Sequence, residues 1–205
     1  MLNLKQIDAV KFTRQQQQAI DNLINNNPNK NGTELWKEEG PNKEFITIKQ
    51  HIRTHYLKLQ KLRCVYCERV MTHGEDQIEH FAPKKNHKRF LYEPLNLTCS
   101  CCVCNNFSNK GIKETIEGNE VMPYKQNNFK YVHPFLDDVD KEIRYKDPFN
   151  LFIDKEHSTP KGKKTIEMFH WDNDVAASNR LVNRLSWCLS PKRRRLFEKI
   201  LNFED

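Results

Sequence analysis

The hydrophobic positions near the start of the chain recur at three- and four-residue steps, the period of a helix that buries one face. Between residues 13 and 27 this face contains Ala19, Ile20, Leu23 and Ile24, and a run of glutamines lies on the opposite face. After an Asn-rich loop, the same period continues up to the first cysteine through Phe45, Ile48, Ile52, Tyr56, Leu59 and Leu62. The pattern predicts two N-terminal helices.

The helical period is lost at Cys64. Residues 64–111 combine short strand-like stretches and turns with clustered Cys, His and Asn side chains, so we expect the chemistry of the protein to lie there. Short strands are predicted beyond this region at 131–135, 143–145 and 151–153. An acidic turn joins the first two of these strands. Short strands between helical segments predict an α+β protein.

The last part of the chain returns to the helical period. Helices are predicted at 163–169 and 174–189, and Ser190 followed by Pro191 begins a final helix. Its first turn carries a basic cluster, Lys192 to Arg195, where the helix dipole disfavours cations. This cluster indicates a surface that meets phosphates or an acidic partner. The predicted organisation is an N-terminal helical segment at 1–62, a central unit at 63–115 and a mostly helical extension at 116–205.

Charge and length narrow the class of protein. The chain has 205 residues, with 34 Lys or Arg against 27 Asp or Glu, and its formal net charge is +7. This balance favours polyanionic partners such as nucleic acid without proving one. No apolar run approaches the roughly 18 residues that a membrane span requires, and glutamines follow the N-terminus where a signal peptide has its apolar core. We expect a soluble, cytoplasmic protein with no membrane partner.

Six of the seven cysteines lie between Cys64 and Cys104. In a reducing compartment such clustering indicates metal ligation rather than disulfides. Cys64 and Cys67 form a C-x-x-C pair that can reach one tetrahedral zinc ion, and the second pair is either Cys99 with Cys102 or Cys101 with Cys104. Spacing alone does not choose between these registers. Four thiolates leave no open position on zinc, so the predicted ion is structural.

Polar residues with catalytic chemistry lie between the two cysteine pairs. Glu79 and His80 end a β-like stretch before Pro83, and their side chains point to opposite faces unless the strand bulges or ends there. Asn96 follows, and Asn105 stands directly after Cys104, at the expected start of a helix. A strand pair and a helix pinned by zinc can bring Glu79, His80 and Asn105 around one small cleft.

These residues resemble the HNH nuclease superfamily, whose ββα-metal motif combines an acidic-His pair, an Asn-Leu pair and a C-x-x-C pair followed by His or Asn. The matching positions are Glu79-His80, Asn96-Leu97 and Cys101-x-x-Cys104-Asn105. The resemblance covers about 64–111 and selects the zinc ligands Cys64, Cys67, Cys101 and Cys104. It implies a zinc-pinned ββα-metal (HNH) core, flanked by N-terminal helices and a mostly helical C-terminal extension.

The resemblance implies hydrolysis of a phosphodiester bond with one divalent metal ion. His80 would be the general base that deprotonates water, and Glu79 and Asn105 would hold Mg²⁺ or Mn²⁺. Asn96 would orient the loop or His80, and Lys84 and Lys110 would contact phosphates. Two residues depart from the common pattern: Glu79 stands where Asp is usual, and Asn105 where many members have His. The lysine expected soon after the last cysteine is displaced to Lys110.

A finer resemblance links the chain to the HNH nuclease subunits (PtuB-like) of Septu and retron anti-phage systems. The residues that carry it are Cys64-Val-Tyr-Cys67-Glu68, Ile78-Glu-His-Phe-x-Pro-Lys84 and Asn96-Leu-x-x-Ser-Cys-x-x-Cys-Asn105. It implies a role in anti-phage defence and an ABC-type ATPase subunit (PtuA-like) as partner. A retron reverse transcriptase with its msDNA is a further partner that it allows. Either DNA or RNA fits as substrate, because a nuclease cleft contacts mainly the sugar-phosphate backbone.

Two other classes of function remain open on the same residues. One is a zinc-stabilised module that binds nucleic acid or an ATPase without hydrolysis, and the other is a stand-alone restriction-like endonuclease. Cys99 and Cys102 are interpreted as packing residues or spare thiols, and Cys188 as a small buried helix residue. The seven other histidines are interpreted as exposed or core residues, namely His51, His55, His73, His87, His133, His157 and His170.

Overall fold

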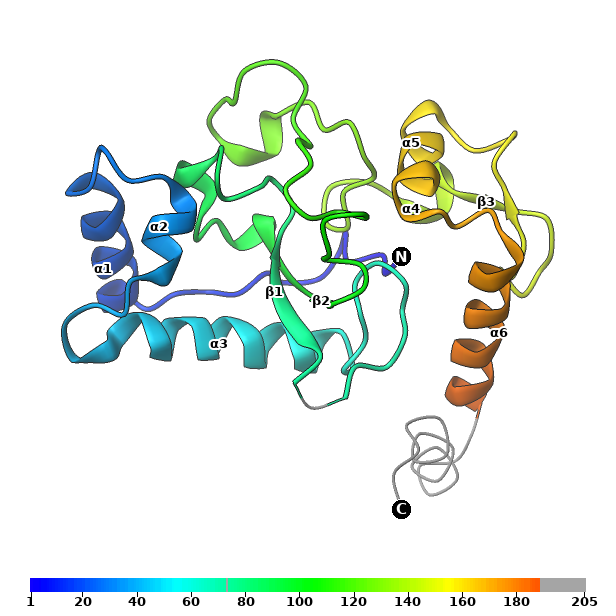
Figure 1. Ribbon diagram of the computed structural model, residues 1–205, viewed down its shortest axis with the longest axis horizontal. Coiled ribbons are helices and arrows are strands. Elements are labelled where there is room, and N and C mark those ends of the chain that lie inside the picture. The colour runs from blue at the N-terminus through cyan, green and yellow to red at the C-terminus, as the bar shows by residue number, and fades with distance from the viewer. Residues whose placement is uncertain (73, 189–205) are drawn as a thin grey trace.

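The structure is a computed structural model that describes residues 1–72 and 74–188 (Figure 1). Its helices are α1 (Arg14–Asn25), α2 (Gly32–Lys37), α3 (Glu44–Leu59), α4 (Val139–Glu142), α5 (Pro160–Phe169) and α6 (Asp174–Cys188), with short 3-10 turns at Pro41–Lys43, Lys88–Phe90, Pro94–Asn96 and Tyr124–Gln126. Its strands are β1 (Asp76–His80), β2 (Leu97–Cys101), β3 (Arg144–Tyr145) and β4 (Ile153–Asp154). The described part is therefore a mixed protein of helices and two small antiparallel sheets.

Both predicted N-terminal helices are present. Helix α1 begins with a capping box, in which Thr13 Oγ1 accepts from the Gln16 amide at 3.2 Å and Gln16 Oε1 accepts from the Thr13 amide at 3.0 Å. Helix α3 ends at Leu59, earlier than predicted, because Lys61 and Leu62 take positive φ values of 53° and 60°. The short α2 was not predicted; Asn31 caps it by accepting from the amides of Thr33 and Glu34.

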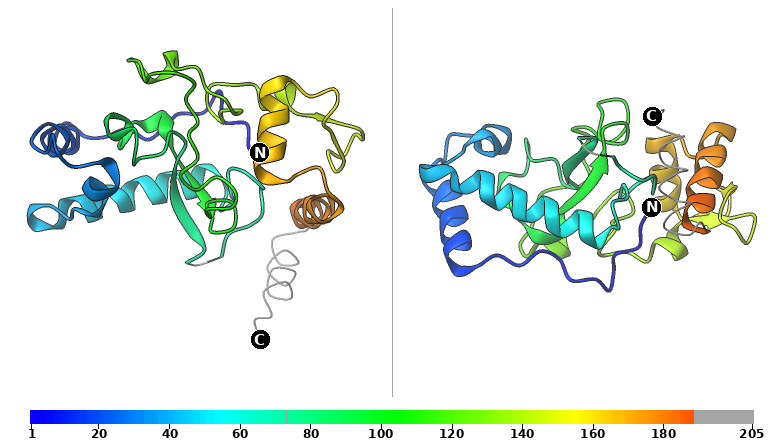
Figure 2. Two further views of the ribbon diagram at one scale, coloured as in Figure 1. Left: turned by 45° about the horizontal axis from the view of Figure 1, so that its top comes forward. Right: turned by 90° about the horizontal axis from the view of Figure 1, so that it is seen from below.

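The β1–β2 pair lies between the N-terminal helices at one end of the molecule and α5 and α6 at the other (Figures 1 and 2). Its antiparallel register pairs Asp76 with Cys101 and His80 with Leu97. Helix α3 holds both strands: Arg53 donates to the two carboxylate oxygens of Asp76, and the buried Gln60 side chain exchanges hydrogen bonds of 2.7 and 2.8 Å with the backbone of Cys99. These contacts fix the sheet on which the candidate residues lie.

The helix expected after Cys104 does not form; residues 102–112 are a series of turns. Asparagine side chains in this segment hydrogen-bond to backbone groups that a helix would otherwise use. Asn109 Nδ2 donates to the Val103 carbonyl at 2.8 Å, and Asn106 Oδ1 accepts from the Asn109 amide at 3.0 Å. The Lys110 amide donates back to the Cys104 carbonyl at 3.1 Å, which closes the segment into a loop. The ββα arrangement is thus present only as its two strands.

The C-terminal predictions are met in part. Residues 131–135 are not a strand, because Pro134 has no amide hydrogen and the His133 amide donates to the Asp137 carboxylate at 2.7 Å. The two other predicted strands shorten to β3 and β4, and a short helix, α4, begins within the acidic turn. Helices α5 and α6 match the prediction. The final helix and the basic cluster Lys192 to Arg195 lie outside the described residues, as do His73 and the side chain of Cys188.

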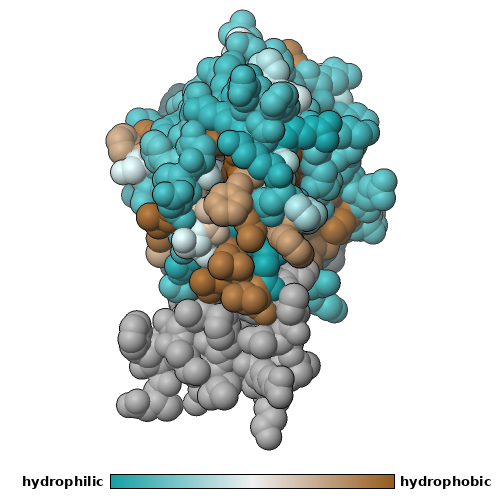
Figure 3. Space-filling view, turned by 90° about the vertical axis from the view of Figure 1, so that its right-hand side faces the viewer, coloured by the Kyte–Doolittle hydropathy of each residue, from teal (hydrophilic) through white to brown (hydrophobic). Residues whose placement is uncertain are grey.

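One large hydrophobic core joins all three segments of the chain. It contains Leu35 and Ile52 from the N-terminal helices, Leu97 from β2, and Ile166 and Trp171 from the C-terminal part. A smaller cluster around Phe81, Phe90 and Tyr124 packs under the loop between β1 and β2. Figure 3 shows the face over α6, on which apolar side chains gather beside polar ones. The exposed apolar residues of the C-terminal part include Phe149, Phe152 and Leu185. Among the described residues, no helix is both long and apolar enough to cross a membrane.

Candidate metal centre and the buried site beside it

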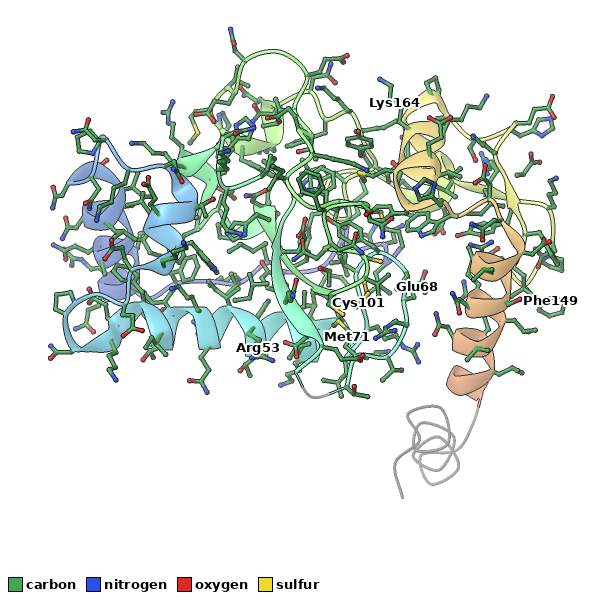
Figure 4. The ribbon with its side chains drawn as sticks, viewed as in Figure 1. Arg53, Glu68, Met71, Cys101, Phe149 and Lys164 are labelled. Atoms are coloured by element: carbon green, nitrogen blue, oxygen red, sulfur yellow. The ribbon has the colours of Figure 1, made fainter. Side chains whose placement is uncertain are left out.

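Four cysteine sulfurs converge beside the outer end of the β1–β2 sheet (Figure 4). The Sγ atoms of Cys64, Cys67, Cys101 and Cys104 all lie within 4.8 Å of one another, and Cys67 Sγ is 3.8 Å from Cys101 Sγ. Zinc–sulfur bonds of about 2.3 Å in a tetrahedron place the sulfurs about 3.8 Å apart. The four residues therefore fit a zinc ion closed by protein ligands, and this is the only group of His, Cys, Asp or Glu with metal-site geometry among the described residues.

The other two candidate cysteines point elsewhere. The Cys99 sulfur faces α3, 3.9 Å from the Arg53 carbonyl, and burial raises the pKa of its thiol to about 12. Cys102 is exposed. By contrast, hydrogen bonds from Cys104, Cys64 and Cys67 lower the pKa of the Cys101 thiol, and the Cys104 amide adds a bond of 3.5 Å to its sulfur. Because the sulfurs of Cys101 and Cys104 lie with those of Cys64 and Cys67, the geometry selects Cys101 with Cys104 as the second pair.

A cleft of about 700 Å³ opens beside the cysteine cluster and is bordered on its other side by α6. Three of its lining residues are Arg69, Arg180 and Arg184. Asn183 of α6 donates to the Cys67 carbonyl at 3.1 Å, which ties the helix to the cluster. The Arg69 Nε atom is buried without a hydrogen-bond partner. The cleft thus combines cationic side chains with the surface of the candidate metal centre.

His80, the last residue of β1, is buried with 4% of its surface exposed. Its Nε2 lies 3.0 Å from the Leu91 carbonyl, and its ring meets Trp36 edge-on at 4.6 Å. Because a carbonyl only accepts, Nε2 carries the proton and Nδ1 presents a lone pair. That Nδ1 is buried without a hydrogen-bond partner. Burial lowers the pKa of His80 well below its ordinary value, and the charges of Lys84 and Lys110 lower it further.

Glu79 is also buried, with 2% of its surface exposed, and it has its own partners. Its Oε1 accepts from the Tyr66 hydroxyl at 3.0 Å and lies 3.1 Å from the Lys110 ammonium. Burial and the Glu79 charge raise the pKa of Tyr66 well above its ordinary value, so the phenol stays a donor. Lys110 has no exposed surface. Glu79 therefore belongs to a buried ion pair inside the protein.

Asn96 is fully buried and fastens the loop between the strands. Its Oδ1 accepts from the Ala82 amide at 2.6 Å and from the Tyr124 hydroxyl at 2.9 Å, and its Nδ2 donates to the carbonyls of Ala82 and Phe90 at 3.2 and 2.9 Å. Tyr124 in turn lies 2.9 Å from His133 Nε2. The side chain of Asn96 thus contacts the loop and not His80.

The two remaining candidates lie at the edge of the site. Asn105 is half-buried, and its Nδ2 donates to Gln77 Oε1 at 2.8 Å. Lys84 is half-buried, and burial lowers its pKa. Of the two predicted Mg²⁺ or Mn²⁺ ligands, Glu79 already has two donors at Oε1, whereas Asn105 uses its Nδ2 and not the Oδ1 that would bind a cation. The divalent-cation site on these two residues stays a prediction.

Sequence reasoning missed three side chains that shape the site. Tyr66 lies inside the first C-x-x-C pair and binds Glu79, Trp36 packs on His80, and Tyr124 joins Asn96 to His133. Only Tyr66 carried a signal, because its place between two predicted zinc ligands put it beside the sheet. Trp36 and Tyr124 come from segments far away in the sequence, which no spacing rule connects to residues 64–111.

No protein-family model matches the chain, and no curated protein matches it. The site therefore has to be interpreted from its own chemistry.

Proposed function

We propose that the chain is an HNH-type endonuclease that hydrolyses phosphodiester bonds of nucleic acid, with His80 as its general base. The observation that carries the proposal is the hydrogen bonding of the His80 imidazole. Its Nε2 is bound to the Leu91 carbonyl, and its Nδ1 lone pair has no hydrogen-bond partner. A general base needs such a free lone pair in a fixed orientation. The resemblance of residues 64–111 to HNH nucleases supports the same role for His80.

The chain's own residues perform distinct tasks in this proposal. His80 Nδ1 accepts the proton of the attacking water, while Asn96 holds the loop after β1 and the zinc-pinned cysteines hold the far end of the sheet. Lys84 contributes positive charge next to His80. Glu79 Oε1 already contacts the Tyr66 hydroxyl and the Lys110 ammonium, so no step is assigned to a divalent cation on it. Because Nδ1 is buried under neighbouring side chains, among them Trp36, water reaches it only after these side chains move.

The cleavage experiment uses the zinc-loaded full chain with plasmid, single-stranded DNA and transfer RNA, in Mg²⁺, in Mn²⁺ and in EDTA. His80→Ala should lower cleavage by about 10²- to 10⁴-fold, the usual effect of losing a general base, with unchanged zinc content. His157→Ala is the matched control, since this side chain is 75% exposed and far along the chain. Cleavage by His80→Ala within a fewfold of the wild type would eliminate His80 as the base.

The proposal includes a partner, and this part rests on the resemblance alone. We propose that the chain acts as the effector subunit of a Septu- or retron-type defence complex with an ABC-type ATPase subunit. Co-purification of the two proteins, with and without charge reversal at Lys192, Arg193, Arg194 and Arg195, tests the association. A chain that cleaves at full rate alone and never binds the ATPase would instead support a stand-alone endonuclease.

A second candidate function is a zinc-stabilised binding module without hydrolysis. Two observations favour it: the Glu79 carboxylate is enclosed in an ion pair, and the cleft beside the cysteine cluster is lined by three arginines, of which Arg69 is paired with Glu75. Arginine is suited to phosphate recognition. Binding of nucleic acid without cleavage in any of the metal conditions, weakened by Arg184→Ala, would favour this candidate over the nuclease.

A further inference from the structure

The Lys110 side chain enters the protein and places its ammonium on the candidate catalytic strand. Its Nζ lies 3.1 Å from the His80 carbonyl, 3.1 Å from Glu79 Oε1 and 3.5 Å from the Gly111 carbonyl. An ammonium has three protons, and each of them has an oxygen acceptor here. Lys110 is fully buried and Glu79 almost so, which makes this a buried ion pair with a complete set of hydrogen bonds.

The loop that follows the cysteine cluster fixes this position. The backbone amide of Lys110 donates a hydrogen bond to the Cys104 carbonyl, which ties Lys110 to a residue of the cysteine cluster. Gly111 then turns the chain with a φ of +41°, and a Cβ atom at this position would lie 2.9 Å from Phe107 Cα. The hydrogen bond to Cys104 and the turn at Gly111 thus constrain the loop on both sides of Lys110 and direct its side chain inward.

The same carboxylate is where the sequence resemblance expects a divalent cation. Glu79 Oε1 already accepts from Tyr66 as well as lying against Lys110. A divalent cation bound there would stand a few ångströms from a buried unit positive charge, and in a site closed to water this repulsion is weakly screened. The ammonium and a divalent cation would therefore repel each other across this carboxylate.

We infer that Lys110 is the resident cation of Glu79, and that its ammonium and a divalent metal ion compete for this carboxylate. The inference does not depend on nuclease activity, because it concerns cation binding alone. It changes the expected role of Lys110 from a surface contact with phosphate to an internal charge. It also makes Lys110 the residue that decides whether Glu79 is available to a metal.

Manganese titration of the zinc-loaded full chain, followed by electron paramagnetic resonance, tests the competition. The Lys110→Gln variant removes the charge but keeps a donor for the His80 carbonyl. We expect it to bind Mn²⁺ at least about tenfold more tightly than the wild type, and the added Glu79→Gln change to abolish the gain. Lys113→Gln is the matched control, since this neighbouring lysine is only half-buried and its ammonium donates to the Ser108 carbonyl rather than to Glu79.

Circular dichroism and zinc content establish that each variant is folded, and Lys110→Met serves as a second charge-free variant. Equal Mn²⁺ affinity in the wild type and the charge-free variants would overturn the inference, as would the absence of Glu79-dependent binding in those variants. If neither variant folds, the wild type decides: a tight Mn²⁺ site that Glu79→Gln removes would overturn it, and the lack of such a site would support it.

Discussion

The cysteine cluster, which includes Cys101 at the end of β2, and the Glu79 carboxylate on β1 meet positive charge in different ways. The cluster gathers four sulfurs at zinc-ligand spacing, and its cationic neighbour Arg69 lines the cleft beside it. Glu79 has the Lys110 ammonium and the Tyr66 hydroxyl within hydrogen-bond distance. We therefore expect the four sulfurs to take a zinc ion from solution, whereas Glu79 already has a cation of the chain as its partner.

The largest expected effect breaks the first of these sites. Cys101→Ser should lose the zinc and destabilise the protein by more than about 4 kcal/mol, because structural zinc supplies much of the folding free energy of a unit this small. Metal analysis and urea denaturation measure the two losses. Cys102→Ser, an exposed neighbour, should lose neither, and Cys99→Ser should keep its zinc. If Cys99→Ser loses its zinc and Cys101→Ser keeps it, the second pair of zinc ligands is Cys99 with Cys102.

The next effect concerns the internal ion pair. Lys110→Ala leaves a buried carboxylate without its partner, which typically costs about 3–5 kcal/mol. Urea denaturation of the zinc-loaded protein measures the free energy of unfolding. Lys113→Ala should change it by less than about 0.5 kcal/mol, because its side chain is at the surface. A Lys110→Ala variant as stable as this control would mean that the pair contributes little to the fold.

A smaller effect is expected from the loop that covers His80. Asn96→Ala removes four buried hydrogen bonds, and the two to the Ala82 amide and carbonyl have no described substitute, so we expect a loss of about 2–4 kcal/mol. Asn105→Ala should cost less than about 1 kcal/mol, since the Asn105 side chain donates to the exposed Gln77. If the nuclease proposal holds, Asn105→Ala should still lower cleavage. Similar stability losses in the two variants would contradict the distinction between them.

The smallest effect is on the pH dependence of folding. Burial lowers the pKa of His133 well below its ordinary value, and the Lys161 charge lowers it further. Below about pH 6.5 the unfolded chain therefore binds a proton that the folded chain does not. Stability present above that pH is lost as the pH falls, by up to about 1.4 kcal/mol per unit for this group.

Denaturation between pH 7.5 and 5.5 checks the slope, with zinc content followed at each pH because acid also protonates thiolates. His133→Gln should show a smaller loss than the wild type, and the exposed His157→Gln should follow the wild type. If the free energy of unfolding falls equally with pH in all three proteins, His133 does not contribute to the pH dependence of stability.

The sequence predicted the parts of the fold that depend on local spacing. The three-and-four period located α1, α3, α5 and α6, and the C-x-x-C pairs located the cysteine cluster once Asn105 had been used to choose the register. The region after Cys104 was predicted wrongly as a helix, because its asparagines bond to nearby backbone atoms in a way that a residue period does not reveal.

The environment of the candidate site required long-range contacts that spacing does not give. Nothing local indicates that Lys110 turns inward to Glu79 or that Trp36 packs on His80. A charged residue is normally exposed, so a buried lysine is the exception that a composition rule misses. The burial of Glu79 and His80 depends on contacts with the whole core, which the spacing of residues in the sequence does not predict.

The measurement that tests the central contrast most directly is the metal content of the full chain after dialysis against zinc and a modest excess of Mn²⁺, determined by inductively coupled plasma mass spectrometry. The wild type should retain one zinc ion per chain on the four cysteines, and no more manganese than Glu79→Gln retains. Manganese bound to the wild type and lost in Glu79→Gln, or zinc retained in full by Cys101→Ser, would contradict the account.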